Sequence, residues 1–154
     1  MLKRVRYAAA GGLVVQRDVL QGLPAAETHL LLLDRPRRAE VRLPKGHIDP
    51  GESAEEAALR ETCEESGYCD LDVLADLGRR TVEFEYKGRH YEREDHYFLM
   101  RLLSARQIAR PVSDARQFRV VWAPLSEACG RLTFEIEQLF AKDAVVALRN
   151  VPGL

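Results

Sequence analysis

The amino-acid sequence predicts a mixed α/β (α+β) fold that occupies residues 1–154 as a single domain. Three observations lead to this prediction. The length of 154 residues, with 46% hydrophobic and 31% charged residues, is typical of one globular domain with a proper core. Short apolar runs typical of strands lie on both sides of one helix-forming segment. A second segment with helical periodicity closes the chain.

The first third of the chain is predicted to form strands joined by polar loops. Ala8–Gln16 and His29–Asp34 are apolar runs typical of buried strands. Val19–Glu27 lies between them, contains Gly and Pro, and is predicted to be a hairpin loop. Arg35–Glu40 is predicted to be an exposed charged loop, and Val41–Leu43 a short strand.

A helix is predicted over residues 53–66. The dipeptide Pro50-Gly51 indicates a turn before it, and Ser53 followed by Glu56 has the spacing of a capping box. Gly67 is the expected C-cap. The small, weakly apolar residues between these caps favour close packing of the helix on a sheet.

The second half of the chain returns to strand patterns and ends with a helix. Residues 71–77 and 79–86 alternate in places, and Lys87-Gly88 is predicted to be a hairpin turn before a strand over 90–103. The remaining predicted elements are strands at Val112 and Phe118–Trp122, a short helical turn over Ser126–Cys129, and a terminal helix over Thr133–Arg149.

Basic residues precede an apolar stretch at the start of the chain, as they do in secretory signal peptides. We interpret this segment as a buried strand, because Gly11-Gly12 interrupts it, Gln16-Arg17-Asp18 ends it, and no small-residue cleavage site follows. No segment approaches the ~20 apolar residues of a membrane span. We therefore expect a cytoplasmic protein that does not enter the membrane.

Charge and cysteine content exclude several classes of protein. The net charge is −1, whereas chains that bind nucleic acid without sequence preference are usually strongly basic. Cys63, Cys69 and Cys129 are odd in number and form no C-x-x-C pair. We therefore expect neither a disulfide framework nor a zinc site, but core thiols in a reducing compartment. The oligomeric state is left open by the sequence.

Residues 46–68 carry the strongest functional information. On a helix, Glu61, Glu64 and Glu65 stand at i, i+3 and i+4, so three carboxylates share one face. Each like-charge pair at this spacing destabilises a helix by roughly 0.2–0.5 kcal/mol. A hard divalent ion such as Mg²⁺ reverses that effect, since it takes oxygen ligands from carboxylates and substrate phosphates. The pattern therefore favours a metal site over a solvated acidic face.

This segment resembles the Nudix box, the signature of hydrolases that cleave a nucleoside diphosphate linked to another group. The match includes every charged and glycine position of the pattern; Thr62 and Tyr68 stand where the family has strictly apolar residues. The matching positions are Gly46, Glu52, Arg60, Glu61, Glu64, Glu65 and Gly67. The resemblance implies an α/β/α sandwich with a mixed sheet. It also implies a MutT-like enzyme that uses Mg²⁺ or Mn²⁺ to hydrolyse phosphoric anhydride bonds of small nucleotides.

The resemblance also implies residue roles. Glu61, Glu64 and Glu65 would bind the divalent metal, and Gly46 would let the backbone approach the metal and the phosphates. Either Glu61 or Glu65 would be the base that accepts a proton from the attacking water. Arg60 would orient the carboxylates by charge-assisted hydrogen bonds, with Glu52 in a supporting position. The candidates for an additional acidic ligand are Asp114, Glu92 and Glu94.

Residues outside the box suggest a substrate. The run Leu43–Glu52 resembles the LPKGH-x-x-x-GE entry of diadenosine polyphosphate hydrolases, and Tyr86 lies where those enzymes carry a tyrosine that can stack on adenine. Lys45 and His47, with Arg42 as a further candidate, would suit a long polyphosphate. We expect a dinucleoside polyphosphate such as diadenosine tetraphosphate as substrate.

Other functions remain open at the level of sequence. A nucleoside triphosphate sanitiser, an RNA 5′-pyrophosphohydrolase and a diphosphoinositol polyphosphate phosphohydrolase share the box. The near-neutral charge weighs against long RNA, and diphosphoinositol substrates need more clustered basic residues. A non-catalytic nucleotide-binding sensor module is the alternative from another class; such modules typically lose box carboxylates, and this chain keeps them all.

Overall fold

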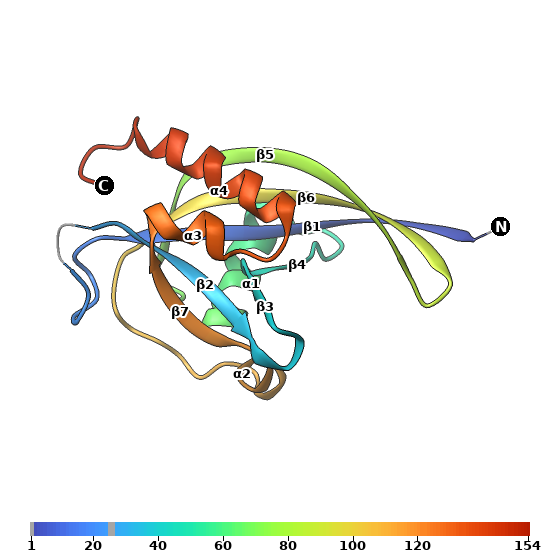
Figure 1. The fold of residues 1–154 in the computed structure, drawn as a ribbon, viewed down its shortest axis with the longest axis horizontal. Helices are drawn as coiled ribbons and strands as arrows, with labels where there is room; N and C mark the ends of the chain where they lie inside the picture. Colours follow the sequence, from blue (N-terminus) through green and yellow to red (C-terminus); the bar gives the residue numbers. More distant parts are fainter. Residues whose placement is uncertain (1, 25–26) are drawn as a thin grey trace.

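The computed structural model describes residues 2–24 and 27–154 (Figure 1). The strands are β1 (Lys3–Gln16), β2 (His29–Arg35), β3 (Glu40–Arg42), β4 (Lys45–His47), β5 (Leu71–Tyr86), β6 (Arg89–Leu102) and β7 (Arg119–Pro124). The helices are α1 (Ala54–Ser66), α2 (Val112–Gln117), α3 (Leu125–Arg131) and α4 (Glu135–Leu148), with a 3₁₀ turn η1 (Pro36–Arg38).

The strands form one mixed seven-stranded sheet in the order β3-β2-β1-β6-β5, with β4 also paired to β1 and β7 to β2. The central pair β1 and β6 is parallel, from Lys3 opposite Arg89 to Val15 opposite Arg101. The remaining pairings among the described strands are antiparallel. Because β4 pairs with the middle of β1, the sheet holds residues 45–47 next to its centre.

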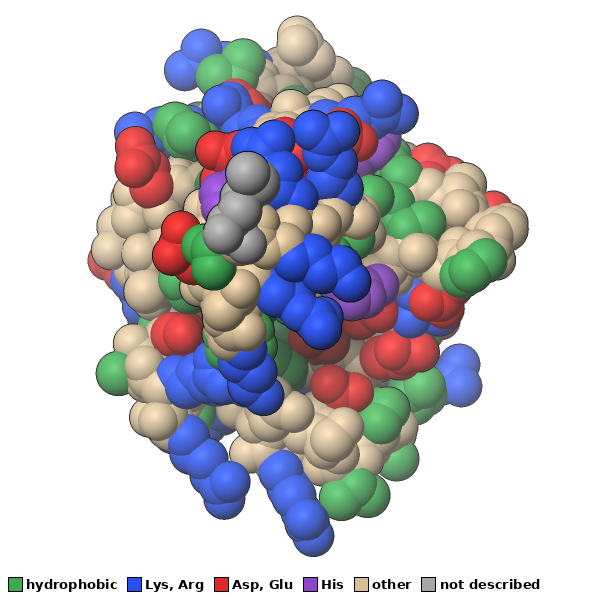
Figure 2. Space-filling view, turned by 90° about the vertical axis from the view of Figure 1, so that its right-hand side faces the viewer, with side chains coloured by type: hydrophobic (Ala, Val, Ile, Leu, Met, Phe, Trp, Pro, Cys, Tyr) green, Lys and Arg blue, Asp and Glu red, His purple; other side chains and the backbone are tan. Residues whose placement is uncertain are grey.

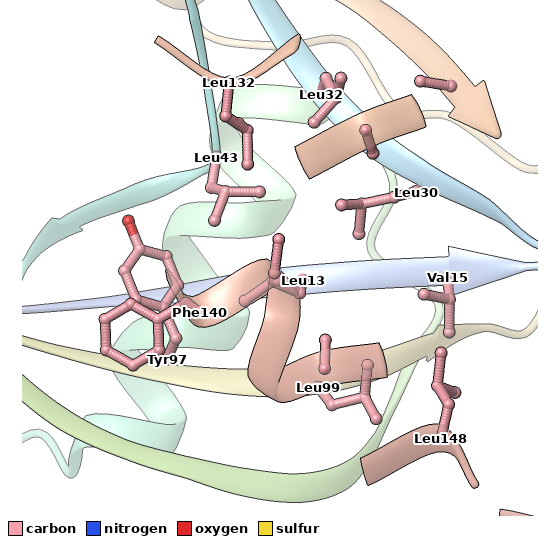
Figure 3. Packing of buried hydrophobic residues seen from close by; sticks show 14 residues of the cluster. Leu13, Val15, Leu30, Leu32, Leu43, Tyr97, Leu99, Leu132, Phe140 and Leu148 are labelled. Atoms are coloured by element: carbon pink, nitrogen blue, oxygen red, sulfur yellow. The ribbon is translucent and has the colours of Figure 1, made fainter. Parts of the chain in front are cut away.

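Helices cover both faces of this sheet, with α1 behind it and α3 and α4 in front of it in Figure 1. Strand β1 alternates between the two layers, as successive side chains of a strand point to opposite faces. Leu13 packs with Phe140 of α4, whereas Val14 packs with Ala57 and Ala58 of α1. The first cluster is drawn in Figure 3. The predicted α/β/α sandwich with a mixed sheet is confirmed.

Beyond these layers, β5 and β6 continue as a hairpin alongside the start of β1, and the three strands form an arm (Figure 1). One face of the arm carries Phe84 and Tyr91, whose rings stack with centroids 5.1 Å apart. Tyr86 lies near the tip and is half exposed. The arm therefore projects aromatic side chains beside the segment that leads into α1.

Several predicted elements differ in extent or type. The two predicted segments 71–77 and 79–86 form one strand, β5, whose register against β6 shifts between Asp76 and Arg79. The prediction of a strand at Val112 was wrong. Pro111 is the N-cap of the short helix α2 there, and the N–H of Phe118 bonds to the carbonyl of Asp114 at the end of that helix. The carbonyl of Pro111 accepts the N–H of Ala115 at 3.0 Å, and this helical turn outweighs the strand preference of one valine.

The expectation of three free thiols was also wrong. The structure joins Cys63 and Cys69 in a disulfide, whose Cα atoms lie 4.5 Å apart, and leaves Cys129 free. Gly67 lies between the two cysteines with φ of +82°, which turns the chain back at the end of α1. A motif search for C-x-x-C cannot detect a pairing made by this turn.

Two further expectations concern the chain's loops and helices. Within the predicted hairpin loop over residues 19–27, residues 25 and 26 lie outside the described residues. Across the described ranges, none of the helices combines the length and the apolar character needed to span a bilayer.

Candidate active site

Helix α1 is fixed at both ends by its own sequence. Ser53 Oγ accepts the N–H of Glu56 at 3.1 Å, and the Glu56 carboxylate accepts the N–H of Ser53 at 3.3 Å, which completes the predicted capping box. At the other end the N–H of Gly67 bonds to the carbonyl of Cys63 at 2.8 Å. These bonds satisfy groups that a helix end leaves unpaired, so the start and phase of the acidic face are locally determined.

The helix lies unusually close to the sheet. A Cβ atom on Gly12 of β1 would fall 2.6 Å from Thr62 Oγ1. Thr62 is fully buried at this contact. The small residues at positions 12 and 62 thus let α1 pack closely against β1. The carboxylates in the last two turns of α1 then reach the β4 segment.

Gly46 is where the helix and β4 meet. A Cβ atom there would lie 2.1 Å from Cδ of Glu61 and 2.3 Å from each of its carboxylate oxygens. The Glu61 carboxylate therefore occupies the space that any other side chain at position 46 would fill. This contact explains the glycine by close approach rather than by an unusual backbone angle.

Arg60 connects the carboxylates of the box. Its guanidinium donates two bonds to Glu52, of 2.7 and 2.9 Å, and one bond of 2.8 Å to Glu61. The same Nη1 atom lies 3.5 Å from Glu64, and Nη2 donates to the carbonyl of His47 at 3.0 Å. Arginine suits this position because its planar fork can serve several acceptors at fixed angles.

The surroundings of Glu52 and Glu61 shift the pKa values of these two carboxylates in opposite directions. Hydrogen bonds from Arg60 and from the backbone N–H of Asp49 lower the pKa of Glu52 to about 2. Burial raises the pKa of Glu61; Arg60 opposes this effect, and the charges of Glu64 and Asp114 add to it. Glu52 is therefore a fixed anion, whereas Glu61 holds a proton more readily than an ordinary glutamate.

Glu65 is the most deeply placed carboxylate of the box, with 7% of its surface exposed. It accepts the backbone N–H of Lys45 at 2.7 Å. Burial raises its pKa to about 8, and the charge of Glu61 adds to this rise. Without a cation, the site therefore favours the protonated form of Glu65 near neutral pH.

Of the downstream acidic candidates, Asp114 is the one whose charge acts on Glu61. It lies on α2, and burial raises its own pKa. Glu92 and Glu94 both lie on β6. Glu92 pairs with Arg6 at 2.6 Å, and Glu94 lies 3.7 Å from Arg79. The structure thus associates Asp114 with the box carboxylates and gives Glu92 and Glu94 other partners.

A cavity of about 370 Å³ opens next to the β4 segment. Cationic side chains dominate its wall, with three aromatic residues and two carboxylates, Glu40 and Glu137. The cations are Arg35, Arg38, Arg42, Lys45 and Arg93, and the aromatic residues are Phe84, Tyr86 and Phe134. The chain's net charge is −1, so this concentration of positive charge is local.

Several of these cations are held in unusual settings. Burial, together with the charges of Arg42 and Arg93, lowers the pKa of Lys45 to about 8. Arg42 lies over the ring of Phe118 at 5.7 Å, and its buried Nε has no hydrogen-bond partner among the described residues. Arg93 is held by Asp95 through bonds of 2.6 and 3.1 Å. An anion in the cavity would stabilise the charged form of Lys45.

A second hollow adjoins the first. It is lined in part by Tyr7, His47 and Tyr91, and it shares Arg38, Phe84 and Tyr86 with the cationic cavity. His47 packs edge-on against Tyr7 with ring centroids 4.5 Å apart. Figure 2 views the molecule from the tip of the arm and shows Lys and Arg side chains gathered near a separate group of Asp and Glu side chains.

Comparison with known proteins decides the family. The model of the NUDIX domain matches residues 14–143. The chain belongs to the Nudix family. A Mycobacterium tuberculosis protein named MutT4 is 37% identical over 145 residues, which cover 93% of this chain and 56% of that protein. The asymmetrical bis(5'-nucleosyl)-tetraphosphatase of Rattus norvegicus is 36% identical over 92 residues, 60% of each chain.

The matched part of this chain therefore spans a little more than half the length of each of these two Nudix relatives. A crystal structure of a C. elegans Ap4A hydrolase superposes with a TM-score of 0.68, covering 94% of this chain and 98% of that one. Its sequence identity is 22%, so the likeness establishes the Nudix fold.

The structure places the residues expected from the Nudix resemblance in two neighbouring groups. Gly46, Glu52, Arg60, Glu61 and Glu64 are joined by direct contacts, and Glu65 reaches them through Lys45. Arg42, Lys45 and Tyr86 line the cationic cavity, while His47 lines the adjoining hollow.

Other cavity residues were not expected from sequence: Arg35, Arg38, Arg93, Phe84, Phe134 and Glu137. The first two belong to the run Arg35-Pro36-Arg37-Arg38, whose charge was visible but had no assigned role. Phe84 and Tyr86 are two apart on β5, so strand parity places them on one face. Arg93 and Glu137 come from distant elements, and local sequence does not bring them together.

The donor set of this Nudix chain fits a hard divalent cation. In the described residues, no three side chains from Asp, Glu, His or Cys converge into a closed metal cage. However, Glu61 and Glu64 both lie within reach of one nitrogen of Arg60, and the charge of Glu61 acts on Glu65. Closely spaced anions that offer only oxygen ligands are what Mg²⁺ or Mn²⁺ would stabilise, and burial raises the pKa values of two of them, Glu61 and Glu65.

Proposed function

We propose that this Nudix chain is a divalent-metal-dependent pyrophosphohydrolase that acts on a dinucleoside polyphosphate such as diadenosine tetraphosphate. The observation that carries the proposal is the position of the cationic, aromatic cavity. Lys45 lines that cavity, its backbone N–H bonds to Glu65, and Gly46 next to it contacts Glu61. A polyphosphate in the cavity would thus lie against the β4 segment whose backbone contacts Glu65 and Glu61.

Glu61, Glu64 and Glu65 would hold the metal, with the backbone of Gly46 beside them. Bound there, the metal would neutralise phosphate charge and acidify a coordinated water. The chain's own groups would do the rest. Glu61 lies partly exposed, has a raised pKa and is suited to accept the proton of the attacking water. Arg60 would hold its carboxylate in place through the 2.8 Å bond.

Glu65 is less suited to be the base. Its carboxylate is committed to the N–H of Lys45 and is almost fully buried, whereas a base must lie within hydrogen-bond reach of the water. We therefore assign proton acceptance to Glu61 and metal binding to Glu65. Glu52, held as an anion by Arg60, supports the guanidinium from the other side.

The cavity walls support a long, doubly aromatic substrate. Cations that outnumber carboxylates favour several consecutive phosphates. Two adjoining hollows share Phe84 and Tyr86, so each can offer an aromatic surface to a base. A nucleoside triphosphate would fill one hollow and a dinucleoside polyphosphate both. The name of the Rattus norvegicus relative, a bis(5'-nucleosyl)-tetraphosphatase, is in keeping with this substrate.

The test is turnover of diadenosine tetraphosphate with Mg²⁺, followed by chromatography of the nucleotide products. Glu64→Gln should lower kcat by orders of magnitude, because it removes a metal ligand whose side chain is accessible. Glu55→Gln is the matched control, since it makes the same change in an exposed residue of α1 outside the acidic face. Tight nucleotide binding in a calorimeter, with no hydrolysis at any divalent ion tried, would instead support a sensor module.

A further inference from the structure

Glu137 is a buried carboxylate that reaches the candidate site from the opposite side of the sheet. It lies in the first turn of α4, only 1% of its surface is exposed, and it accepts the backbone N–H of Leu43 at 2.5 Å. A charged residue is rarely buried to this extent unless specific partners hold it. Leu43 is fully buried as well, so water does not replace this bond.

Glu65 makes the same kind of bond from α1. It accepts the N–H of Lys45, two residues after Leu43. Pro44 lies between them, has no N–H, and uses its carbonyl to accept the N–H of Gly12 at 3.1 Å. Residues 43–45 are therefore held by a helix from each layer and by the central strand β1.

This segment leads directly into Gly46, whose backbone packs against the Glu61 carboxylate. A shift in residues 43–45 would move Gly46 away from that carboxylate or into it. The charges around Glu137 belong to the same region. The charges of Lys45 and Arg42 favour the ionised form of the Glu137 carboxyl group, whereas the charge of Asp95 disfavours it. Figure 3 shows Leu43 next to the rings of Tyr97 and Phe140, which close this region on the α4 side.

We propose that Glu137 is a positioning residue for the reaction: its bond to the Leu43 N–H fixes residues 43–45, so that Gly46 and the Glu61 carboxylate stay in contact. This inference rests on the proposed function for its catalytic consequence, but the positioning itself concerns the protein without substrate. What the Leu43 N–H needs is an acceptor oxygen at the end of a side chain as long as that of glutamate. The negative charge of that side chain is secondary.

Three substitutions separate reach from charge. Glu137→Gln keeps an acceptor oxygen at the same reach and removes the charge. Glu137→Asp keeps the charge and withdraws the oxygen by one methylene. Glu137→Ala removes both. Gln138→Ala is the matched control, because Gln138 is the next residue of α4 and its side chain bonds to a backbone carbonyl elsewhere, that of Leu132 at 2.8 Å.

The first measurement is amide hydrogen exchange of Leu43 and Lys45 in metal-free protein, with Mn²⁺ affinity measured separately by titration. We expect faster exchange at Leu43 in the Asp and Ala variants, with Mn²⁺ affinity and kcat lowered about 10–100-fold, the usual effect of losing an outer partner of a metal site. KM should change much less than kcat. The Gln variant should keep slow exchange at Leu43 and wild-type Mn²⁺ affinity, and Gln138→Ala should stay near wild type in every measurement.

Two outcomes would overturn the proposal. One is wild-type exchange at Leu43 together with wild-type Mn²⁺ affinity in folded Glu137→Asp. The other is a Gln variant in which Leu43 exchanges faster and Mn²⁺ binds more weakly than in the Asp variant. That result would make the charge the essential property. If Glu137→Ala fails to fold, the Gln and Asp variants still decide. If the wild-type protein does not cleave diadenosine tetraphosphate, the proposed function fails, while exchange and Mn²⁺ affinity still test the positioning.

Discussion

The carboxylate of Glu61 lies directly on the Cα atom of Gly46, in the volume that a side chain at position 46 would occupy. This contact joins helix α1 to strand β4. It also sets the geometry of the candidate site, because Glu61 is bonded to Arg60 on its other side.

Gly46→Ala should reduce kcat for diadenosine tetraphosphate by about 100-fold, because a displacement near 1 Å at a reacting group costs about that much. The added methyl group must push away the Glu61 carboxylate or the β4 backbone. Gly130→Ala is the control, since nothing lies within 4 Å of a Cβ atom there and its φ is not positive. Wild-type kinetics for Gly46→Ala would show that the contact is irrelevant to catalysis.

Arg60→Lys should destabilise the protein and lower activity together. Lysine keeps the charge but cannot form the two-pronged bond to Glu52 while also bonding Glu61. We expect a loss of roughly 1–2 kcal/mol in the free energy of unfolding, at the low end for charged hydrogen bonds because Arg60 is partly exposed.

Urea unfolding measures this loss. Arg119→Lys makes the same change in a pair with Asp34 whose arginine is largely exposed, and should change stability by less than about 0.5 kcal/mol. Equal losses in the two variants would contradict the role of Arg60 as a connecting residue.

The buried Glu65 should make the metal-free protein less stable as the pH rises. Its pKa is about 8 in the folded protein and 4.5 ordinarily, so between these values the folded state binds a proton that the unfolded state has released. Stability therefore falls through this window, by up to about 1.4 kcal/mol per pH unit. Glu61 and Glu137, whose pKa values are also raised, contribute with the same sign.

Urea unfolding in the presence of EDTA, between pH 5 and pH 8, tests this behaviour. Glu65→Gln should flatten the fall relative to wild type, and adding Mg²⁺ at pH 8 should stabilise wild type more than the variant. A fall that is equally steep in Glu65→Gln would show that Glu65 does not titrate as proposed.

Tyr86→Ala should raise KM for diadenosine tetraphosphate with little change in kcat. Stacking of a base on an aromatic side chain contributes about 1–3 kcal/mol, which corresponds to roughly 5–150-fold in affinity. Tyr86→Phe keeps the ring and should behave like wild type, so the pair separates stacking from the hydroxyl group. Unchanged KM in Tyr86→Ala would mean that the half-exposed ring does not meet a base.

The local parts of the site could be predicted from sequence. The capping box of Ser53 and Glu56 depends on residues three apart, and so does the shared face of Glu61 and Glu64. Short-range geometry fixes such features once a helix is assumed. The family resemblance then supplied the sandwich fold and the expectation of metal.

The parts that depend on tertiary contacts could not be predicted in the same way. Arg93 reaches the cavity only because β6 pairs with β1, and the disulfide requires the left-handed turn at Gly67. Glu137 did leave a signal. It stands three, seven and eleven residues before Phe140, Ala144 and Leu148, and so on the buried face of its helix. A carboxylate on such a face predicts a buried partner.

The most direct test of the central claim is kcat/KM with Mg²⁺ for diadenosine tetraphosphate, measured beside ATP, a deoxynucleoside triphosphate and RNA with a 5′-triphosphate, for wild type and Glu61→Gln. We predict the highest value for diadenosine tetraphosphate, loss of activity in EDTA, and a fall of at least about 100-fold in the variant. Absence of hydrolysis of all four substrates, or wild-type rates in Glu61→Gln, would contradict the account.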